Sequence, residues 1–192
     1  MGFGHKPYDL ANGELTQEMS ALISAYDGDM MEKLVPIPGE KSANFRDNGG
    51  FSNFYASASF NSAFALNLYF APARTPDGNL TLYYWSAEDY QKAEVLTTEN
   101  ATEVTVMTPN GREFWGEVDG IAAKQMDQAV YFAVSYEADG VTYTTDVMVY
   151  SLGAYCKSLV KQNTDISPLV AATAVYGYYA KRYFRTIEKE EG

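Results

Sequence analysis

The chain of 192 residues is 46% hydrophobic and 20% charged, which supports one folded domain or two small ones and argues against disorder. Its formal net charge of −11 would repel a polyanion, so nucleic acid is excluded as an expected partner. A single Cys and a single His exclude an internal disulfide and a Cys-rich zinc site, and no run of about 18 apolar residues is present to insert into a membrane.

Residues 1–35 are predicted to form an N-terminal helical segment. Four apolar residues recur there at i, i+3, i+4 and i+7, the spacing of one helix face. They are Met19, Leu22, Ile23 and Tyr26. The segment 35–50 is punctuated by Pro and Gly, which is typical of a connector.

Residues 36–150 are predicted to form an antiparallel β-sandwich of about seven strands. Three turn motifs separate short runs that are rich in aromatic and β-branched residues, and each contains Asp-Gly or Asn-Gly, which tolerate the backbone of tight hairpins. The motifs are "TPDGN" at 75–79, "TPNGR" at 108–112 and "EADGV" at 137–141. The expected hairpins pair 64–70 with 80–85, 104–107 with 113–118, and 130–136 with 142–150. Residues 120–127 are expected to be a loop or a single helical turn.

Residues 151–192 are predicted to form a helical hairpin packed on the sandwich, which makes the chain one compact α+β unit. Ser151 is suited to cap the first helix, and Ser167-Pro168 is a start signal for a second helix over 168–187. We expect two adjacent stripes of the second helix to be a buried packing seam rather than a ligand-stacking surface. The stripes are Leu169, Ala172, Tyr176, Tyr179 and Tyr183, and Val170, Thr173, Gly177, Ala180 and Phe184.

The motif "YGYYAKRYF" at 176–184 contains Tyr176, Gly177, Ala180, Tyr183 and Phe184. In these positions it is similar to the "NYGAAAQxYF" helix ending of a module found in large surface proteins of gut Firmicutes, which the chain resembles. Residues 121–158 resemble its "IAAKxLD" turn, "DG" hairpin, "YS" strand exit and following helix, and residues 3–15 resemble its "YFGYNTDxLANxxL" stretch. The chain departs from the pattern at Val175, where the module has Asn, and at Tyr178-Tyr179, where it has an Ala pair.

This resemblance implies a non-enzymatic structural or adhesive module of an exported bacterial surface protein. Its expected partners are neighbouring domains of the same polypeptide and a glycan or a host or matrix component. The start "MGFGHKPYDL" lacks the features of a signal peptide. We therefore expect a fragment of an extracellular or cell-surface protein, with a cytoplasmic protein that starts at Met1 as the alternative.

No catalytic residue, cofactor or metal site is assigned from the sequence. Cys156 lies on an apolar helix stripe and is expected to be a buried, inert thiol. His5 lies in the N-terminal segment and no G-x-S-x-G motif is present, which argues against a serine hydrolase. Glu117 and Asp119 would share one strand face, which keeps a glycoside hydrolase as a second alternative, but on a chain with 25 acidic residues such pairs arise by chance.

Two further acidic groups are weaker candidates for chemistry. Glu88 and Asp89 are neighbours, and on a strand they would point to opposite faces. Asp27, Asp29 and Glu32 bring oxygen donors close together, as a Ca²⁺ site would, but lack the spacing of an EF-hand loop. A turn that ends the helix explains the second group equally well.

The aromatic residues of the β region favour one binding function, that of a carbohydrate-binding module. Tyr83, Tyr84 and Trp85 are consecutive, so both faces of one strand carry an aromatic ring, and Trp115 follows the second turn motif. Exposed rings of this kind stack on sugars. The alternative is that these residues belong to the sandwich core, where large aromatic side chains are commonly buried.

Overall fold

The computed structural model describes residues 35–37, 39–60, 64–108, 114–162 and 167–190. The predicted N-terminal helix, His5 and the acidic group at residues 27–32 lie outside the described residues, as does most of the turn motif at 108–112.

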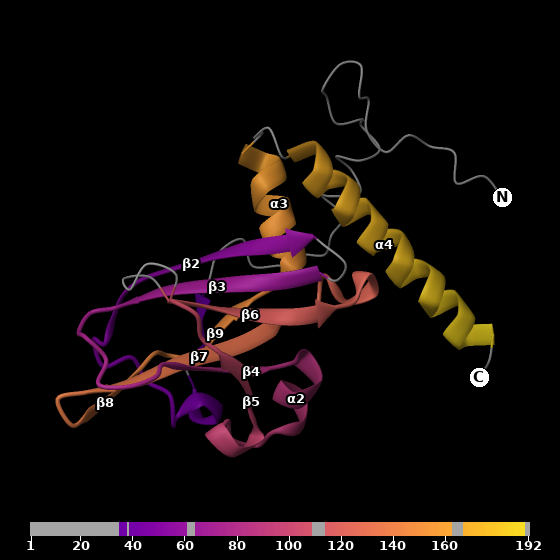
Figure 1. Cartoon of the computed structure of the whole chain (residues 1–192). Helices are drawn as coiled ribbons and strands as arrows, with labels where there is room; N and C mark the ends of the chain where they lie inside the picture. The colour runs from indigo at the N-terminus through magenta and orange to yellow at the C-terminus, as the bar shows by residue number, and fades with distance from the viewer. Residues whose placement is uncertain (1–34, 38, 61–63, 109–113, 163–166, 191–192) are drawn as a thin grey trace.

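The described strands form two antiparallel sheets, one above the other in Figure 1. The larger sheet has the order β1-β9-β7-β4-β5, with β8 paired to β7. Its strands are β1 (Val35–Pro36), β4 (Thr81–Trp85), β5 (Thr102–Thr105), β7 (Val130–Ala138), β8 (Val141–Thr144) and β9 (Met148–Tyr150). The smaller sheet has the order β2-β3-β6, formed by β2 (Phe51–Phe60), β3 (Phe64–Pro72) and β6 (Phe114–Ile121). The expected α+β class with antiparallel sheets is confirmed.

The main core lies between the two sheets. Side chains alternate along each strand, so β3 directs Leu66, Leu68 and Phe70 into this core and its intervening residues the other way. Phe132 and Val134 of β7 meet them from the larger sheet. A second cluster contains Phe45, Trp85, Leu96, Ala133 and Val147. The central strand β4 therefore contributes to two separate clusters, with Leu82 in the first and Trp85 in the second.

Three helices accompany the sheets: α2 (Ala87–Lys92), α3 (Leu152–Gln162) and α4 (Ser167–Glu190). The hydroxyl of Ser151 accepts a hydrogen bond of 3.0 Å from the backbone N–H of Ala154, which confirms the expected cap of α3. Short 3-10 turns occur at Glu40–Ser42, Thr98–Asn100 and Ala123–Gln125, the last inside the segment predicted to be a loop or helical turn. Among the described helices, none combines the length and hydrophobicity that crossing a membrane requires.

One of the three predicted hairpins is confirmed. β7 pairs with β8 around Asp139 and Gly140, whose φ angles of 53° and 72° are those that a tight hairpin turn needs. The first hairpin is wrong, because β3 and β4 lie in different sheets. The second is met at one point only, the isolated antiparallel bridge between Met107 and Trp115, because β5 and β6 belong to different sheets.

The predicted packing seam of α4 is wrong for its large residues. Leu169, Tyr176 and Tyr183 are 60–61% exposed, and Tyr179 and Phe184 are also exposed. The buried face carries smaller side chains instead: Val170, Ala171, Thr173, Ala174, Val175 and Gly177. Small residues allow α4 to approach α3 and the 123–125 turn closely, which explains why they, and not the tyrosines, face inward.

Candidate ligand-binding face

Three aromatic rings lie side by side across the smaller sheet, one from each strand. Tyr55 of β2 pairs with Tyr69 of β3, which pairs with Trp115 of β6. The rings of Tyr55 and Tyr69 are parallel to within 2°, with centroids 4.6 Å apart. Those of Tyr69 and Trp115 are 6.0 Å apart and inclined by 23°. We call Tyr55, Tyr69 and Trp115 the aromatic row.

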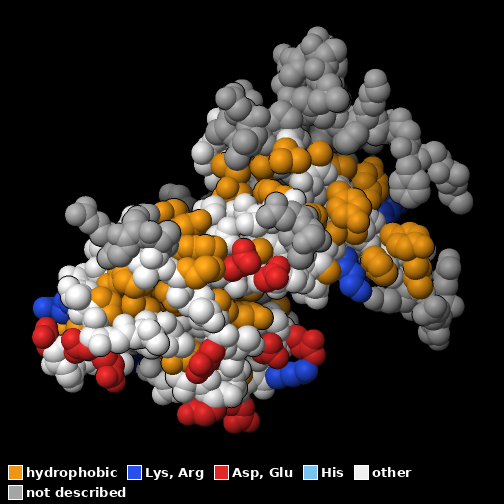
Figure 2. Space-filling view, viewed as in Figure 1, with side chains coloured by type: hydrophobic (Ala, Val, Ile, Leu, Met, Phe, Trp, Pro, Cys, Tyr) orange, Lys and Arg blue, Asp and Glu red, His pale blue; other side chains and the backbone are white. Residues whose placement is uncertain are grey.

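The aromatic row lies on the face of the smaller sheet that points away from the main core. Neither core cluster of the described residues includes any of the three rings. Tyr55 is 40% exposed, and Tyr69 and Trp115 are partly exposed. Figure 2 shows hydrophobic side chains at the surface over this sheet. Met107, which is exposed and is bridged to Trp115 by two backbone hydrogen bonds, extends the apolar surface beyond β6.

A row of polar side chains lies beside the aromatic row on the same face. Ser57 pairs with Asn67, and Asn67 pairs with Glu117, each two positions along its strand from an aromatic ring and therefore about 7 Å from it. The amide Nδ2 of Asn67 donates to Ser59 Oγ at 3.0 Å and to Ser57 Oγ at 3.4 Å. We call Ser57, Asn67 and Glu117 the polar row.

The amide of Asn67 has unused hydrogen-bonding capacity. The side chain is 7% exposed, and among the described residues its Oδ1 atom has no hydrogen-bond partner. Buried polar atoms are almost always paired, and Asn67 Oδ1 is one of two exceptions among the described side chains. Ser57 Oγ also donates to the hydroxyl of Tyr69 at 3.4 Å, which connects the polar row to the aromatic row.

Helix α3 borders this face through Tyr155. Its hydroxyl is hydrogen-bonded to the backbone of Ala58 on β2 and lies close to Tyr69. Burial is the largest effect on the hydroxyl and raises the pKa of Tyr155, while the bond to Ala58 opposes that rise. Tyr155 therefore remains a neutral phenol at physiological pH.

Of the four aromatic residues predicted to bind a ligand, only Trp115 lies in the aromatic row. Trp85 is 0% exposed, and its indole Nε1 donates to Asn100 Oδ1 at 2.8 Å. The rings of Trp85 and Phe45 are in an edge-to-face arrangement, with their centroids 5.3 Å apart. The structure thus corrects the expectation for Trp85, because an enclosed ring offers no face to a ligand. Tyr84 packs against the main core and Tyr83 against the second cluster, both partly buried. A ligand role for Tyr83, Tyr84 or Trp115 stays a prediction.

Tyr55 and Tyr69 were not predicted, although the sequence carries a signal for Tyr69. In "FALNLYF" at 64–70, Leu66, Leu68 and Phe70 alternate with Ala65, Asn67 and Tyr69. That alternation already separates a core-facing set from an outward-facing set.

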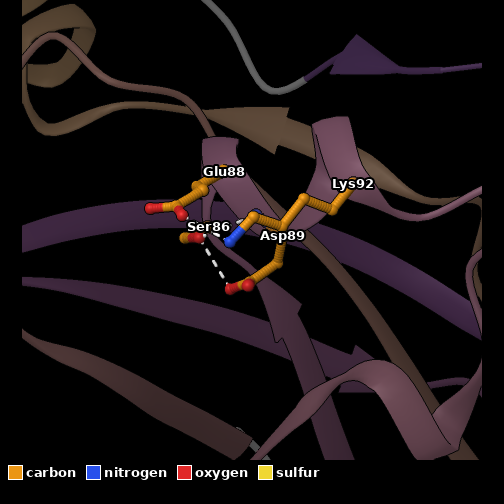
Figure 3. A network of polar contacts seen from close by, with 4 residues as sticks. All are labelled: Ser86, Glu88, Asp89 and Lys92. Atoms are coloured by element: carbon orange, nitrogen blue, oxygen red, sulfur yellow. Dashed lines mark hydrogen bonds and ion pairs between the residues drawn. The ribbon is translucent and has the colours of Figure 1, made fainter.

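Three of the four acidic residues considered as catalytic pairs, namely Glu88, Asp89 and Asp119, are engaged in local structure. Figure 3 shows Glu88 and Asp89 at the start of α2, not on a strand. Asp89 accepts a hydrogen bond from the Ser86 hydroxyl at 2.6 Å, and Glu88 forms an i,i+4 ion pair with Lys92. The carboxylate of Asp119, which is exposed, accepts from the backbone N–H of Gly120 at 2.6 Å.

Other reactive or concave features lie away from the aromatic row. Cys156 is 0% exposed, as expected, and burial raises the pKa of its thiol to about 12, so it is protonated at neutral pH. An open pocket of about 510 Å³ is lined by Gly39, Glu40, Ser42, Phe45, Arg46, Asp47 and Asp146. Among the described residues, no group of three or more His, Cys, Asp or Glu side chains is arranged to hold a metal ion.

No protein family matches the sequence, and no curated protein is similar to it. It resembles one solved chain, titled "Crystal structure of Br derivative BhCBM56", a carbohydrate-binding module (CBM), with 16% sequence identity and a TM-score of 0.36. That match covers 54% of this chain and 99% of the other. A similarity at this TM-score does not establish a shared fold.

Proposed function

We propose that this chain is a non-catalytic glycan-binding module whose binding face is the aromatic row. The observation that carries the proposal is the arrangement of Tyr55, Tyr69 and Trp115, whose rings come from three paired strands and present one partly exposed surface outside both core clusters. A sugar ring offers a flat patch of C–H groups, and such a patch packs best on the flat face of an aromatic ring.

The sheet also lowers the entropic cost of binding. Each ring is fixed by its strand and by its neighbour in the row, so little side-chain freedom is lost when a ligand arrives. The polar row supplies what the rings lack. Ser57 and Glu117 are partly exposed and present hydroxyl and carboxylate groups beside the rings, which can hydrogen-bond to sugar hydroxyls, while the buried Asn67 holds Ser57 in place through its Nδ2.

The other expectations agree with a glycan ligand and remain proposals. An adhesive module of an exported surface protein would meet host or plant glycans outside the cell, and neighbouring domains of the same polypeptide would position it. In this proposal Glu117 accepts hydrogen bonds from the ligand and does not act as one of two catalytic carboxylates.

Affinity electrophoresis tests the proposal directly. The purified chain is run in native gels that each contain one soluble polysaccharide from a panel of plant β-glucans, xylans, mannans and host mucin. At least one polysaccharide should retard the wild-type chain. Trp115→Ala and Tyr55→Ala should each weaken that retardation about fivefold, because an aromatic contact contributes about 1 kcal/mol and 1.4 kcal/mol is tenfold in affinity.

Tyr183→Ala is the matched control, since Tyr183 is an exposed tyrosine on α4 and lies outside the aromatic row. It should be retarded like the wild type, and all variants should show a cooperative unfolding transition. If no polysaccharide of the panel retards the wild type, or if Trp115→Ala is retarded equally, the proposal is wrong.

A further inference from the structure

The aromatic row runs across the strands of the smaller sheet, from one edge of the sheet to the other. Its residues are direct register partners, Tyr55 with Tyr69 and Tyr69 with Trp115, so the row crosses β2, β3 and β6 at about a right angle. Among the described strands, β2 and β6 are the two edges of this sheet, and no further strand of it lies beyond either end of the row. Beyond β6 the described surface continues with exposed Met107. A long chain laid along the row can therefore continue past both of its ends.

The rings of the row repeat at a nearly regular step and a nearly constant inclination. The centroid distances are 4.6 Å from Tyr55 to Tyr69 and 6.0 Å from Tyr69 to Trp115, close to the separation of about 4.8 Å between neighbouring strands. The ring planes differ by 2° in the first pair and by 23° in the second. A ligand matches this surface best when its own flat units keep one inclination and follow one another at a similar step.

The polar row and helix α3 restrict one side of the aromatic row. Ser57 and Glu117 lie there, both partly exposed, and they can hydrogen-bond to hydroxyl groups along one edge of a bound chain. Further along β2 on this side, the Tyr155 hydroxyl of α3 is bonded to the backbone of Ala58. A branch that projects past the polar row would run towards α3, and an unbranched chain avoids that contact.

The linkage of a glycan decides whether its sugars keep one inclination. In a β-1,4-linked chain of glucose or mannose every glycosidic bond is equatorial, so the chain is an extended ribbon whose rings remain nearly parallel. In a β-1,3-linked glucan the chain turns at each linkage and forms a helix, so successive rings differ in inclination. The regular step of the aromatic row therefore favours the ribbon over the helix.

We propose that the aromatic row binds the interior of an unbranched β-1,4-linked glucan or mannan, with three consecutive sugars over Tyr55, Tyr69 and Trp115. This inference rests on the proposed glycan-binding function. It adds the linkage of the ligand, the direction of its chain across the strands and the number of sugars that the site holds.

Isothermal titration calorimetry of the full chain tests the inference, with β-1,4-linked oligomers of glucose and of mannose that are one to six sugars long. For at least one of these sugars, affinity should rise about fivefold with each added sugar up to three, because each reaches one more ring, and by less than about twofold beyond three. Reduction of the terminal sugar of the hexamer to its alditol should leave the affinity unchanged, because the row holds the interior of the chain.

Tyr55→Ala removes the ring at one end of the row and should lower the affinity for the trimer about fivefold, to the wild-type affinity for the dimer. Tyr183→Ala, outside the row, is the matched control and should bind the trimer like the wild type. β-1,3-linked glucose oligomers of the same lengths are the comparison ligands, and their trimer should bind at least about fivefold more weakly than the best β-1,4-linked trimer.

The inference is overturned if the β-1,3-linked trimer binds as tightly as the β-1,4-linked trimers, if a single sugar binds as tightly as three, or if the reduced hexamer no longer binds. Gel retardation that depends on Trp115 but occurs only with xylan, mucin or a β-1,3-glucan would also overturn it, and would leave the proposed function standing. Absence of retardation by every polysaccharide would contradict both.

Discussion

Gly50 and Gly116 lie where the backbone approaches a side chain from another element. A Cβ atom at Gly50 would lie 2.4 Å from the Cβ of Tyr143, and one at Gly116 would lie 2.4 Å from Cδ2 of Leu82. The contact at Gly50 is the stricter one, because the Cβ of Tyr143 is attached to the backbone and cannot rotate away. The carbonyl of Gly50 also accepts a hydrogen bond of 2.7 Å from the hydroxyl of buried Tyr136.

Gly50→Ala should lower the free energy of unfolding by about 1–3 kcal/mol, the usual cost of forcing an extra carbon into a packed region. Gly78→Ala is the control, since a Cβ there meets nothing within 4 Å, and it should change stability by less than about 0.5 kcal/mol. Urea denaturation of the two variants measures the difference. Equal midpoints would show that Tyr143 and Gly50 are not in close contact.

The second core cluster depends on a single amide in the Thr98–Asn100 turn. Asn100 Oδ1 accepts hydrogen bonds from Trp85 Nε1 at 2.8 Å and from the backbone N–H of Thr97 at 3.0 Å. Its Nδ2 donates to the carbonyl of Val95 at 2.9 Å. The Asn100 side chain therefore joins this turn to strand β4 through the buried indole of Trp85.

Asn100→Ala should lower the free energy of unfolding by about 1–3 kcal/mol, because the buried Trp85 N–H would lose its acceptor. Asn79→Ala removes a side-chain amide from an exposed position and should change the free energy of unfolding by less than about 0.5 kcal/mol. Thermal unfolding followed by circular dichroism compares the two variants. If Asn79→Ala and Asn100→Ala melt at the same temperature, the hydrogen bond to Trp85 contributes nothing to stability.

At the scale of elements, the sequence predicted the local β7–β8 turn correctly, but it did not predict which strands pair when they are far apart in the chain. The β7–β8 turn was predictable because the positive φ angles of Asp139 and Gly140 suit the residues themselves. The same Asp-Gly signal at 77–78 closes no hairpin. Asp77 donates its N–H to the carbonyl of Glu137 at 2.8 Å, so this turn is held against the end of β7 while β3 pairs with β2 and β6.

The packing of α4 was mispredicted for its tyrosines because helix spacing alone does not decide which stripe faces inward. Spacing correctly grouped the tyrosines on one side, and the predicted burial of Gly177 is confirmed, but packing against α3 buries Ala171 and Ala174 in place of the tyrosines. Trp85 was assigned to the ligand-binding set, and its burial bears out the alternative that it belongs to the core. The residues that enclose it, Phe45 and Leu96, come from segments without a predicted role in the fold, so its burial became evident only from the folded chain.

For the whole molecule, net charge limits the kind of glycan that fits the proposal. A chain with a net charge of −11, and with Glu117 in the polar row, would repel sulfated or uronic-acid polymers. We therefore expect a neutral glycan as the ligand.

The two tryptophans make the central claim measurable in one spectrum, because Trp85 is fully buried and Trp115 is in the aromatic row. A ¹H–¹⁵N correlation spectrum should contain one indole signal from each, and Trp115→Phe assigns them. The spectrum is recorded while the chain is titrated with a neutral oligosaccharide derived from whichever polysaccharide retards it in the gels.

The Trp115 indole signal is expected to shift saturably during this titration, while the Trp85 signal should stay in place. A titration that moves the Trp85 signal alone, or that leaves both signals unmoved at saturating oligosaccharide, would contradict binding at the aromatic row.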